Sequence, residues 1–173
     1  MKLFDEVCAR LDAASVGYAL IGGAAMGLQG VPRSTQDFDL LTVDARVLDA
    51  AFWKDVAGAA RLRRGDADDP LAGVVRLESA GLFPVDLVVG RFEWQRRIVE
   101  RAERLAVGRG KVPVVGAADL ILLKLFAGGS QDAWDIEQLL AVNSQAAKDV
   151  EAQLAELPPE SAGLWARLRG RES

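Results

Sequence analysis

The first two thirds of the chain alternate short apolar runs with glycine, proline or polar breaks. Apolar positions at helical spacing predict an amphipathic helix over residues 3–14, which ends before Gly17. Shorter apolar runs predict strands at residues 18–21, 38–43, 74–78 and 85–89 and a short extended piece at 111–115. Between them we expect helices at residues 24–28, 45–57 and 92–104 and a loop at 65–70.

After Gly116 the pattern becomes helical. We predict helices at residues 117–127, 131–142 and 145–156, separated by Gly128-Gly129 and Asn143-Ser144, and a short arginine-rich tail from Pro158. Because strands come early and helices late, the pattern predicts an α+β fold. We expect a core over residues 1–115 and a C-terminal helical region over residues 116–173 packed on it.

The composition changes this picture by what it lacks. Half of the residues are apolar, as in a folded globular chain, but there is no histidine and only one cysteine, Cys8. These absences exclude histidine-based triads, an internal disulfide and Cys-rich or His-ligated zinc sites. Chemistry must therefore rest on carboxylates, lysine, arginine and backbone amides, and carboxylates alone favour hard cations such as Mg²⁺ or Mn²⁺.

Charge and hydropathy limit the cellular locations and the classes of partner that we expect for this protein. The formal net charge of −4 is not the global footprint of a nucleic-acid-binding protein, although a local basic patch is still allowed. No apolar run approaches the roughly 20 residues of a membrane span. Asp5 and Glu6 stand where a signal peptide would be apolar. We therefore expect a cytoplasmic protein with no membrane partner.

The acidic pair Asp37 and Asp39 stands at the start of an apolar strand. Side chains two apart in a strand point to the same face, so both carboxylates project together while Phe38 points the other way, into the core. A divalent cation would compensate the repulsion, and two such metals can clamp a phosphoryl-group displacement. Taken alone, the pair is more often a solvated strand end.

A third acid, Asp86, interrupts the otherwise apolar run from Phe83 to Val89. A lone carboxylate in such a run must face a site or a partner. The alternative is an edge-strand aspartate that points to solvent or pairs with an arginine. The residue by itself does not separate these two interpretations.

A glycine pair, Gly22-Gly23, lies between a predicted strand and a predicted helix. Glycines there let the backbone approach a ligand, and a helix N-terminus offers N–H groups to an anion. Arg33, Ser34 and Thr35 precede the acidic pair and are suited to donate hydrogen bonds to a triphosphate. The alternative is a tight turn followed by a polar loop, because neither a Walker A motif nor Gly-x-Gly-x-x-Gly is present.

Together these segments resemble the polymerase-β-like nucleotidyltransferase superfamily, in which a Gly-Gly or Gly-Ser helix start precedes an Asp-x-Asp pair and a third Asp lies on a neighbouring strand. The segments are residues 18–25, 33–41 and 84–88. Residues 119–135 are similar to the Asp-Leu-x-x-x-Lys and Asp-x-x-Asp signature of the abortive-infection (AbiEii-like) nucleotidyltransferase toxins and their uncharacterised relatives. The chain departs from the pattern at Ala24, where the Gly-Ser form has serine, and shows no obvious acceptor-binding domain.

The resemblance implies a fold and roles for nine residues. The fold would be a mixed twisted sheet flanked by helices. Asp37, Asp39 and Asp86 would hold the metal and carry catalysis; Gly22, Gly23, Arg33 and Ser34 would position the nucleotide; Lys124 and Asp132 match the family's lysine and later acid. In the reaction that the resemblance implies, an acceptor would attack the α-phosphate of an NTP such as ATP, and pyrophosphate would be released. Mg²⁺ or Mn²⁺ would be the cofactor.

Two of these residues have competing interpretations. Lys124 lies in the apolar run 120–126, so its ammonium either snorkels to solvent or reaches a site; the resemblance favours a phosphate contact. Asp132 is either a first-turn acid of a helix capped by Ser130 or an active-site acid near Lys124.

A basic segment lies between residues 91 and 111. It is either an acceptor-binding surface for tRNA or another anion or, as we favour, a solvated helix face. Its cationic residues are Arg91, Arg96, Arg97, Arg101, Arg104, Arg109 and Lys111.

The leading hypothesis is therefore an Mg²⁺-dependent nucleotidyltransferase that modifies an unidentified acceptor, either tRNA, a protein or a small molecule. The resemblance adds the hypothesis of a toxin with a protein antitoxin as partner. The alternative is a catalytically weak or inactive module that keeps the fold to bind an NTP or a partner. A third hypothesis, an antibiotic-modifying enzyme, keeps the chemistry and changes the acceptor.

Overall fold

The computed structural model describes residues 2–170 and divides into two compact units. The sheet unit contains the described residues up to Ala24 together with Ser34–Val115. The helical unit contains Ala25–Arg33 and the described residues from Gly116 onward. The domain boundary between residues 115 and 116 stays a prediction.

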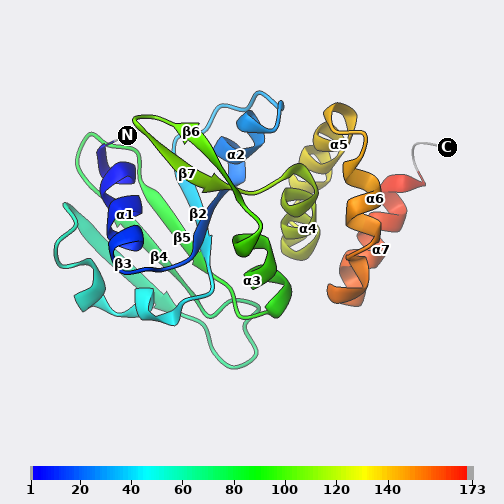
Figure 1. Cartoon of the computed structure of the whole chain (residues 1–173). Helices are drawn as coiled ribbons and strands as arrows, with labels where there is room; N and C mark the ends of the chain where they lie inside the picture. The colour runs from blue at the N-terminus through cyan, green and yellow to red at the C-terminus, as the bar shows by residue number, and fades with distance from the viewer. Residues whose placement is uncertain (1, 171–173) are drawn as a thin grey trace. The chain divides into compact units, whose positions relative to one another are not determined.

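The sheet unit is built on one mixed sheet, with the strand order β3-β4-β5-β2-β1-β7-β6 among the described residues (Figure 1). The central strands are β1 (Tyr18–Ile21), β2 (Phe38–Thr42) and β5 (Val85–Val89), flanked by β3 (Ala59–Arg64), β4 (Gly73–Glu78), β6 (Glu103–Val107) and β7 (Gly110–Val114). β2 is antiparallel to β1 and parallel to β5, and β1 is parallel to β7. The mixed sheet with its helices confirms the predicted α+β class.

Alternation along β4 and β5 gives the sheet an apolar face and a polar face. Val85, Leu87 and Val89 are buried, whereas the residues between them are half-buried. The same alternation in β4 places Arg76 on the half-buried face. Because neighbouring strands are paired in register, one face of the sheet forms the core and the other carries charged groups.

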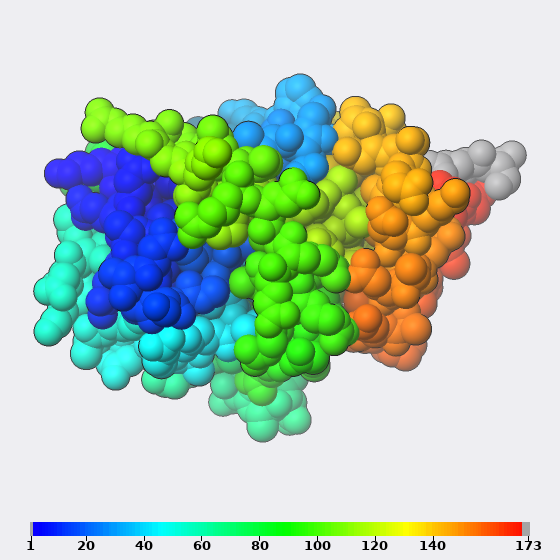
Figure 2. Space-filling view, in the orientation of Figure 1, coloured from blue at the N-terminus to red at the C-terminus, as the bar shows by residue number. Residues whose placement is uncertain are grey.

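Helix α1 (Lys2–Ala13) covers the apolar face with one side and faces solvent with the other (Figures 1 and 2). Its inward residues recur at helical spacing, as predicted, and are Leu3, Phe4, Val7, Cys8 and Leu11. The ring of Phe4 stacks on Phe38 of β2, with 4.4 Å between ring centroids. Phe38 therefore points away from the polar face, as the sequence predicted.

Two of the predicted helices in this unit are wrong in extent. Residues 45–57 form two short 3-10 helices, η1 (Ala45–Leu48) and η2 (Ala50–Trp53), before β3 begins. Asp44 caps the first and Asp49 the second, and the extended backbone of Asp49 interrupts the helical path. The predicted helix 92–104 is α3 (Glu93–Glu100) followed by β6.

The helical unit contains α4 (Ala117–Ala127), α5 (Asp132–Val142), α6 (Ala146–Glu151), η3 (Leu154–Glu156) and α7 (Pro159–Arg169). The first two confirm the predicted helices, and α4 ends at Gly128 in the left-handed conformation, with φ of 62°. The predicted helix 145–156 is instead α6 followed by η3, and the predicted tail is a helix. Pro159 starts α7, whose Ser161 hydroxyl donates to the Leu125 carbonyl at 3.1 Å. Within residues 2–170, no helix combines the length and apolar character required to cross a membrane.

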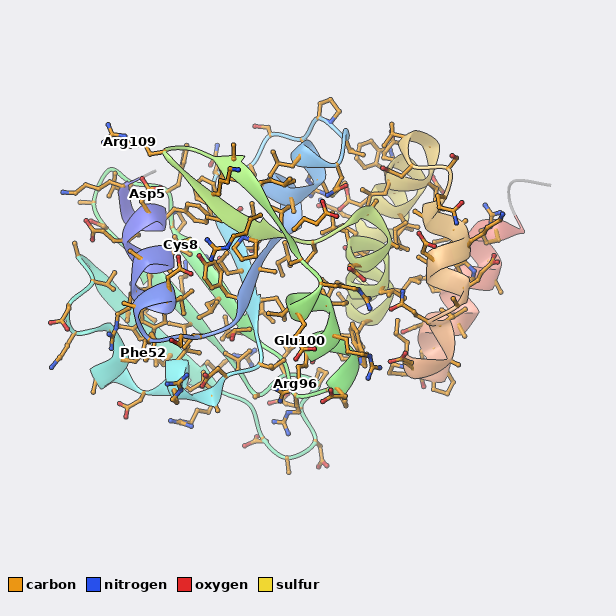
Figure 3. All side chains as sticks on the ribbon, in the orientation of Figure 1. Asp5, Cys8, Phe52, Arg96, Glu100 and Arg109 are labelled. Atoms are coloured by element: carbon orange, nitrogen blue, oxygen red, sulfur yellow. The ribbon has the colours of Figure 1, made fainter. Side chains whose placement is uncertain are left out.

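The buried thiol of Cys8 gives the first testable prediction (Figure 3). Burial raises the pKa of Cys8 to about 12 and also raises the pKa of Tyr18, its hydrogen-bond partner. The unfolded thiol ionises near pH 9, so the folded state holds this proton more tightly and loses stability as the pH rises from about 9 towards 12. We expect the free energy of unfolding to fall by up to about 1.4 kcal/mol per pH unit for each such group.

Urea denaturation followed at a series of alkaline pH values checks this expectation. The Cys8→Ala variant is the control, because it removes one titrating group and should flatten part of the decline. An unfolding free energy that stays constant from about pH 8 to pH 11 would contradict the prediction.

Candidate functional site

The three predicted acids of the sheet unit converge. One carboxylate oxygen from each of Asp37, Asp39 and Asp86 lies within 4.8 Å of the other two, and all three residues are half-buried. Asp39 and Asp86 are register partners on the parallel strands β2 and β5, and Asp37 stands immediately before β2. The strand pairing therefore places three carboxylates on the polar face of the sheet.

Two neighbouring side chains orient the acids. The Thr35 hydroxyl donates to Asp37 Oδ1 at 2.7 Å. Arg76 Nη1 donates to Asp86 Oδ2 at 2.6 Å. Burial raises the pKa of Asp86, the guanidinium of Arg76 opposes this rise, and the charge of Asp37 adds to it. Asp86 therefore faces the acid cluster and pairs with an arginine, but its strand is central, so the edge-strand interpretation is wrong.

The donor set suits a hard divalent cation. It consists of carboxylate oxygens, with no imidazole or thiolate, which is the set that Mg²⁺ and Mn²⁺ prefer. Three anionic groups this close repel one another, and a bound cation would neutralise them. The cluster therefore fits the metal role predicted for Asp37, Asp39 and Asp86.

Gly22 gives the cluster its space. Its φ of +65° lies in the left-handed region, and a Cβ at this position would overlap the Asp39 carboxylate. The following residue, Gly23, belongs to the first turn of α2 (Gly22–Leu28), a helix of seven residues. The structure thus explains the first glycine by its closeness to Asp39.

Replacing Gly22 with alanine should damage the cluster. The left-handed backbone costs about 1–2 kcal/mol for a non-glycine residue, and the new methyl group displaces the Asp39 carboxylate. We expect the affinity for Mg²⁺ or Mn²⁺, measured by calorimetry, to fall at least about tenfold, which corresponds to about 1.4 kcal/mol.

Gly27→Ala is the matched control for this change. Gly27 lies in the same helix, has nothing within 4 Å of an added Cβ and does not have a positive φ. The alanine should stabilise the helix by about 0.5–1 kcal/mol and leave metal binding unchanged. Equal metal affinities of the two variants would show that Gly22 does not make room for Asp39.

The predicted nucleotide-binding residues divide between the units. Ser34 belongs to the sheet unit and is exposed. Arg33, Lys124 and Asp132 meet in the helical unit around a residue that the prediction did not select, Asp135. Two predicted cations are therefore already bound to carboxylates.

Asp135 is the centre of this helical-unit charge cluster. Its side chain is 1% exposed and accepts hydrogen bonds at Oδ2 from Arg33 Nη1 and from Lys124 Nζ, the latter at 2.5 Å. Lys124 Nζ also donates to Asp132 Oδ1 at 3.1 Å. Lys124 therefore does not snorkel to solvent, because only 13% of its side chain is exposed.

Asp132 lies in the first turn of α5 and near Lys124, and its role as an active-site acid stays a prediction. It pairs with Lys124, and its Oδ2 accepts the backbone N–H of Gly129 at 2.7 Å in the turn before α5. The residue at the N-cap position of α5 is Gln131, so the predicted cap at Ser130 is wrong. Asp132 closes the turn itself and leaves the serine exposed.

The basic segment does not form one helix face. Helix α3 ends at Glu100, so Arg104 and Lys111 lie on the β6–β7 hairpin. Arg104 donates to Asp12 at 3.1 Å. Arg91 donates to the carbonyls of three loop residues, Asp66, Ala67 and Leu71. Arg91 and Arg104 thus make hydrogen bonds within the sheet unit.

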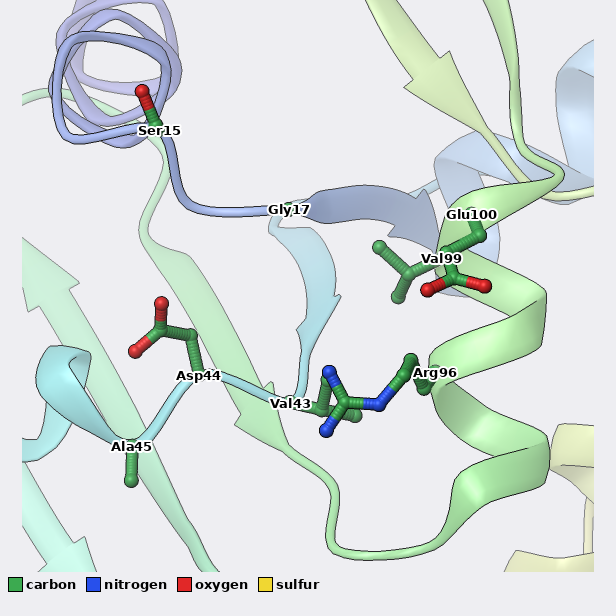
Figure 4. Close-up of a pocket in the computed structure, with 8 residues that line it drawn as sticks. All are labelled: Ser15, Gly17, Val43, Asp44, Ala45, Arg96, Val99 and Glu100. Atoms are coloured by element: carbon green, nitrogen blue, oxygen red, sulfur yellow. The ribbon is translucent and has the colours of Figure 1, made fainter.

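A separate pocket of about 440 Å³ lies in the sheet unit, at the opposite ends of β1 and β2 from Asp39 (Figure 4). Two of its charged residues have partners within the chain, since Asp44 pairs with Arg46 at 2.6 Å and Arg96 with Glu93 at 3.2 Å. The lining residues are Ser15, Gly17, Val43, Asp44, Ala45, Arg96, Val99 and Glu100. None of the predicted site residues belongs to it.

One family model matches most of the chain. Residues 1–157 match the model of a family described as nucleotidyl transferase of unknown function (DUF2204). No curated protein sequence matches the chain.

Several solved structures are similar in fold. They include an antigenic nucleotidyltransferase-like protein from Paracoccidioides brasiliensis, with 21% identity, 95% of this chain and 92% of that chain covered and a TM-score of 0.50. A nucleotidyltransferase candidate from Thermotoga maritima shows 17% identity, 80% and 91% coverage and a TM-score of 0.57. The antibiotic-resistance factor ANT(2'')-Ia, in complex with adenylyl-2''-tobramycin, shows 16% identity, 99% and 97% coverage and a TM-score of 0.54. These findings confirm the predicted nucleotidyltransferase fold of the polymerase-β-like superfamily.

Proposed function

Because the chain belongs to the DUF2204 family of nucleotidyl transferases, we propose that it transfers a nucleoside monophosphate from an NTP to an acceptor hydroxyl. Asp37, Asp39 and Asp86 would hold the Mg²⁺ or Mn²⁺ ions and form the catalytic centre. The observation that carries the proposal is the convergence of these three carboxylates on the polar face of the sheet.

In the proposed reaction, the acceptor oxygen bonds to the α-phosphorus, the bond from that phosphorus to the bridging oxygen of the β-phosphate breaks, and pyrophosphate leaves. A divalent cation supplies charge neutralisation on the phosphates and makes the acceptor hydroxyl easier to deprotonate. Asp86, half-buried beside the other two carboxylates, would take the proton of the hydroxyl.

The surrounding residues hold the three carboxylates in position. Thr35 fixes one oxygen of Asp37, Arg76 fixes one oxygen of Asp86, and Gly22 leaves the Asp39 carboxylate room to turn toward the cluster. A preorganised set of this kind needs little rearrangement as charge develops, which is how positioning lowers the barrier. Catalysis of this kind needs no histidine.

Two similarities support different chemical classes of acceptor. The sequence resemblance to AbiEii-like toxins supports tRNA or a protein as the acceptor and an antitoxin as the partner. The fold similarity to ANT(2'')-Ia supports a small hydroxylated molecule such as an aminoglycoside. Ser34, Gly23 and the cations Arg33 and Lys124 stay proposed nucleotide contacts.

Incubation with α-labelled NTPs, Mg²⁺ and three acceptor pools tests the function. The pools are total tRNA, cell protein and an aminoglycoside panel. We expect label to appear on one pool with the wild-type chain and to disappear with Asp39→Asn. Absence of label from every pool would count against the transferase and for the second candidate below.

The second candidate is an NTP-binding or partner-binding module with weak or no turnover. One observation favours it: Arg33 and Lys124 are both engaged by Asp135, so neither is poised to take a triphosphate. Calorimetry with Mg²⁺-NTP separates the candidates, because a module of this kind would bind the nucleotide without transferring it.

A further inference from the structure

A second pocket, of about 420 Å³, lies within the helical unit. Arg33, Ser130, Gln131, Trp134 and Asp135 line it. All five residues belong to this unit, so the pocket is complete without the sheet unit. Arg33 is held in place at one side, because it donates to Asp135 and, through Nη2, to Gln131 Oε1 at 3.2 Å.

The charges beside this pocket are balanced. Two cations, Arg33 and Lys124, pair with two anions, Asp132 and Asp135. A phosphate entering the pocket would have to break one of these pairs, whereas a neutral polar group would not. The balance therefore favours an uncharged ligand here.

One buried oxygen of Asp135, a residue that lines the pocket, lacks a donor. Asp135 Oδ2 receives both cations, but Oδ1 is buried and has no hydrogen-bond partner among the described residues. A buried acceptor without a donor destabilises the protein, because no hydrogen bond replaces its lost hydration. A ligand that brings an N–H group to Oδ1 would supply this hydrogen bond.

Trp134 supplies a flat apolar surface to the pocket, which Asp135 also lines. It is 53% exposed, whereas Trp53, Trp94 and Trp165 are at most 7% exposed. It lies on the first turn of α5, one residue before Asp135. A planar ring that stacks on Trp134 can direct a substituent at its edge toward the carboxylate.

We propose that this pocket binds a nucleobase carrying an exocyclic amine, as in adenine or cytosine. The ring stacks on Trp134, the amine donates to Asp135 Oδ1, and Gln131 and Ser130 lie at the pocket wall as polar groups. The inference rests on the proposed function in naming nucleotides as the ligand class, but it concerns a different unit from the acid cluster. The base can be that of the NTP or one belonging to the acceptor.

Adenosine is the probe, titrated without metal and without phosphate into the full chain while the tryptophan indole N–H signals are followed by NMR. We expect the Trp134 signal to move and that of Trp53, buried in the sheet unit, to stay. Trp134→Ala should weaken binding about tenfold, as the loss of about 1.4 kcal/mol of stacking implies. Val142→Ala, which removes an equally exposed side chain of the same helix, should leave the affinity unchanged.

The ligand itself can be varied without any risk to folding. N6,N6-dimethyladenosine keeps the stacking surface and removes the donor, so it should bind about tenfold more weakly than adenosine. Equal binding of the two nucleosides would overturn the role of Asp135 Oδ1, and a Trp134 signal that does not move at saturating adenosine would overturn the site. Binding of ATP with no binding of adenosine would also overturn it, since phosphate would then be the recognised group.

Two further experiments identify the source of the base and distinguish a failure of the pocket from a failure of the proposed function. Displacement of adenosine by Mg²⁺-ATP would assign the pocket to the NTP, and simultaneous binding would assign it to the acceptor. Asp39→Asn should bind adenosine like the wild type. Adenosine binding without any transfer activity would therefore refute the proposed function and leave the pocket standing.

Discussion

Replacing Asp39 with asparagine is expected to abolish transfer and, at the same time, to stabilise the metal-free protein. The three clustered carboxylates repel one another in the absence of a cation. Removing one charge should raise the free energy of unfolding by about 1 kcal/mol, or about 2–4 °C in Tm for a chain of this size. Transfer should fall at least about a thousandfold, because metal-assisted charge stabilisation contributes several kcal/mol to the barrier.

Thermal unfolding with and without Mg²⁺ measures both effects. The cation should raise the Tm of the wild type and leave that of Asp39→Asn unchanged, so the order of the two proteins reverses when Mg²⁺ is added. Asp55→Asn, at an exposed position of the same unit, should behave like the wild type. If Asp39→Asn lowers the Tm without metal and keeps the response to Mg²⁺, the cluster does not act as a metal centre.

Replacing Lys124 with methionine should strongly destabilise the helical unit. The change removes the ammonium that Asp132 and Asp135 share, while Asp135 stays 1% exposed with Arg33 as its remaining cation. Breaking a buried ion pair from one side costs about 3–5 kcal/mol, because the remaining charge is left without full compensation. We expect a loss of about 3 kcal/mol in the free energy of unfolding.

Hydrogen exchange combined with urea denaturation locates this loss. The amides of α4 and α5 should exchange faster in the variant, since these helices carry the two ends of the cluster. Lys148→Met removes an exposed lysine of the same unit and should change stability by less than about 0.5 kcal/mol. A Lys124 variant as stable as this control would mean that the cluster does not stabilise the fold.

Regular strand geometry made the Asp37–Asp39 pair predictable, whereas the family resemblance supplied Asp86. Asp37 and Asp39 share a face by alternation, and antiparallel partners lie at equal distances from their turn. Arg76 and Asp86 are each five residues from Gly81 and are indeed partners in the register. The same arithmetic identifies the arginine that orients Asp86.

The missed elements share a physical cause. The edge strands β3 and β6 have few buried residues, so their sequences lack the apolar alternation that marks β5. The pattern predicts no element for residues 59–64, extends the helix 92–104 into the start of β6 and predicts a tail in place of α7, whose buried Trp165 stands in an arginine-rich segment. Edge strands are defined by pairing with a distant segment, and local patterns report this weakly.

The role of Asp135 could not be deduced from spacing alone. The Asp-x-x-Asp pattern places Asp132 and Asp135 on one side of α5, but only the folded structure shows that Arg33, 102 residues away, reaches the second acid. A contact between such distant positions depends on how α5 packs with residues 25–33 inside the helical unit. For the same reason, the sequence assigned Arg33 and Lys124 to a triphosphate, whereas the structure pairs both with carboxylates.

The central claim is that Asp37, Asp39 and Asp86 hold divalent cations for nucleotide transfer. A crystal of the protein soaked with Mn²⁺ and a non-hydrolysable NTP analogue tests it most directly. We predict an anomalous peak about 2.0–2.2 Å from an oxygen of each of the three carboxylates, with the α-phosphate bound to the same ion. A nucleotide bound with Mn²⁺ elsewhere, and no peak between these aspartates, would contradict the claim.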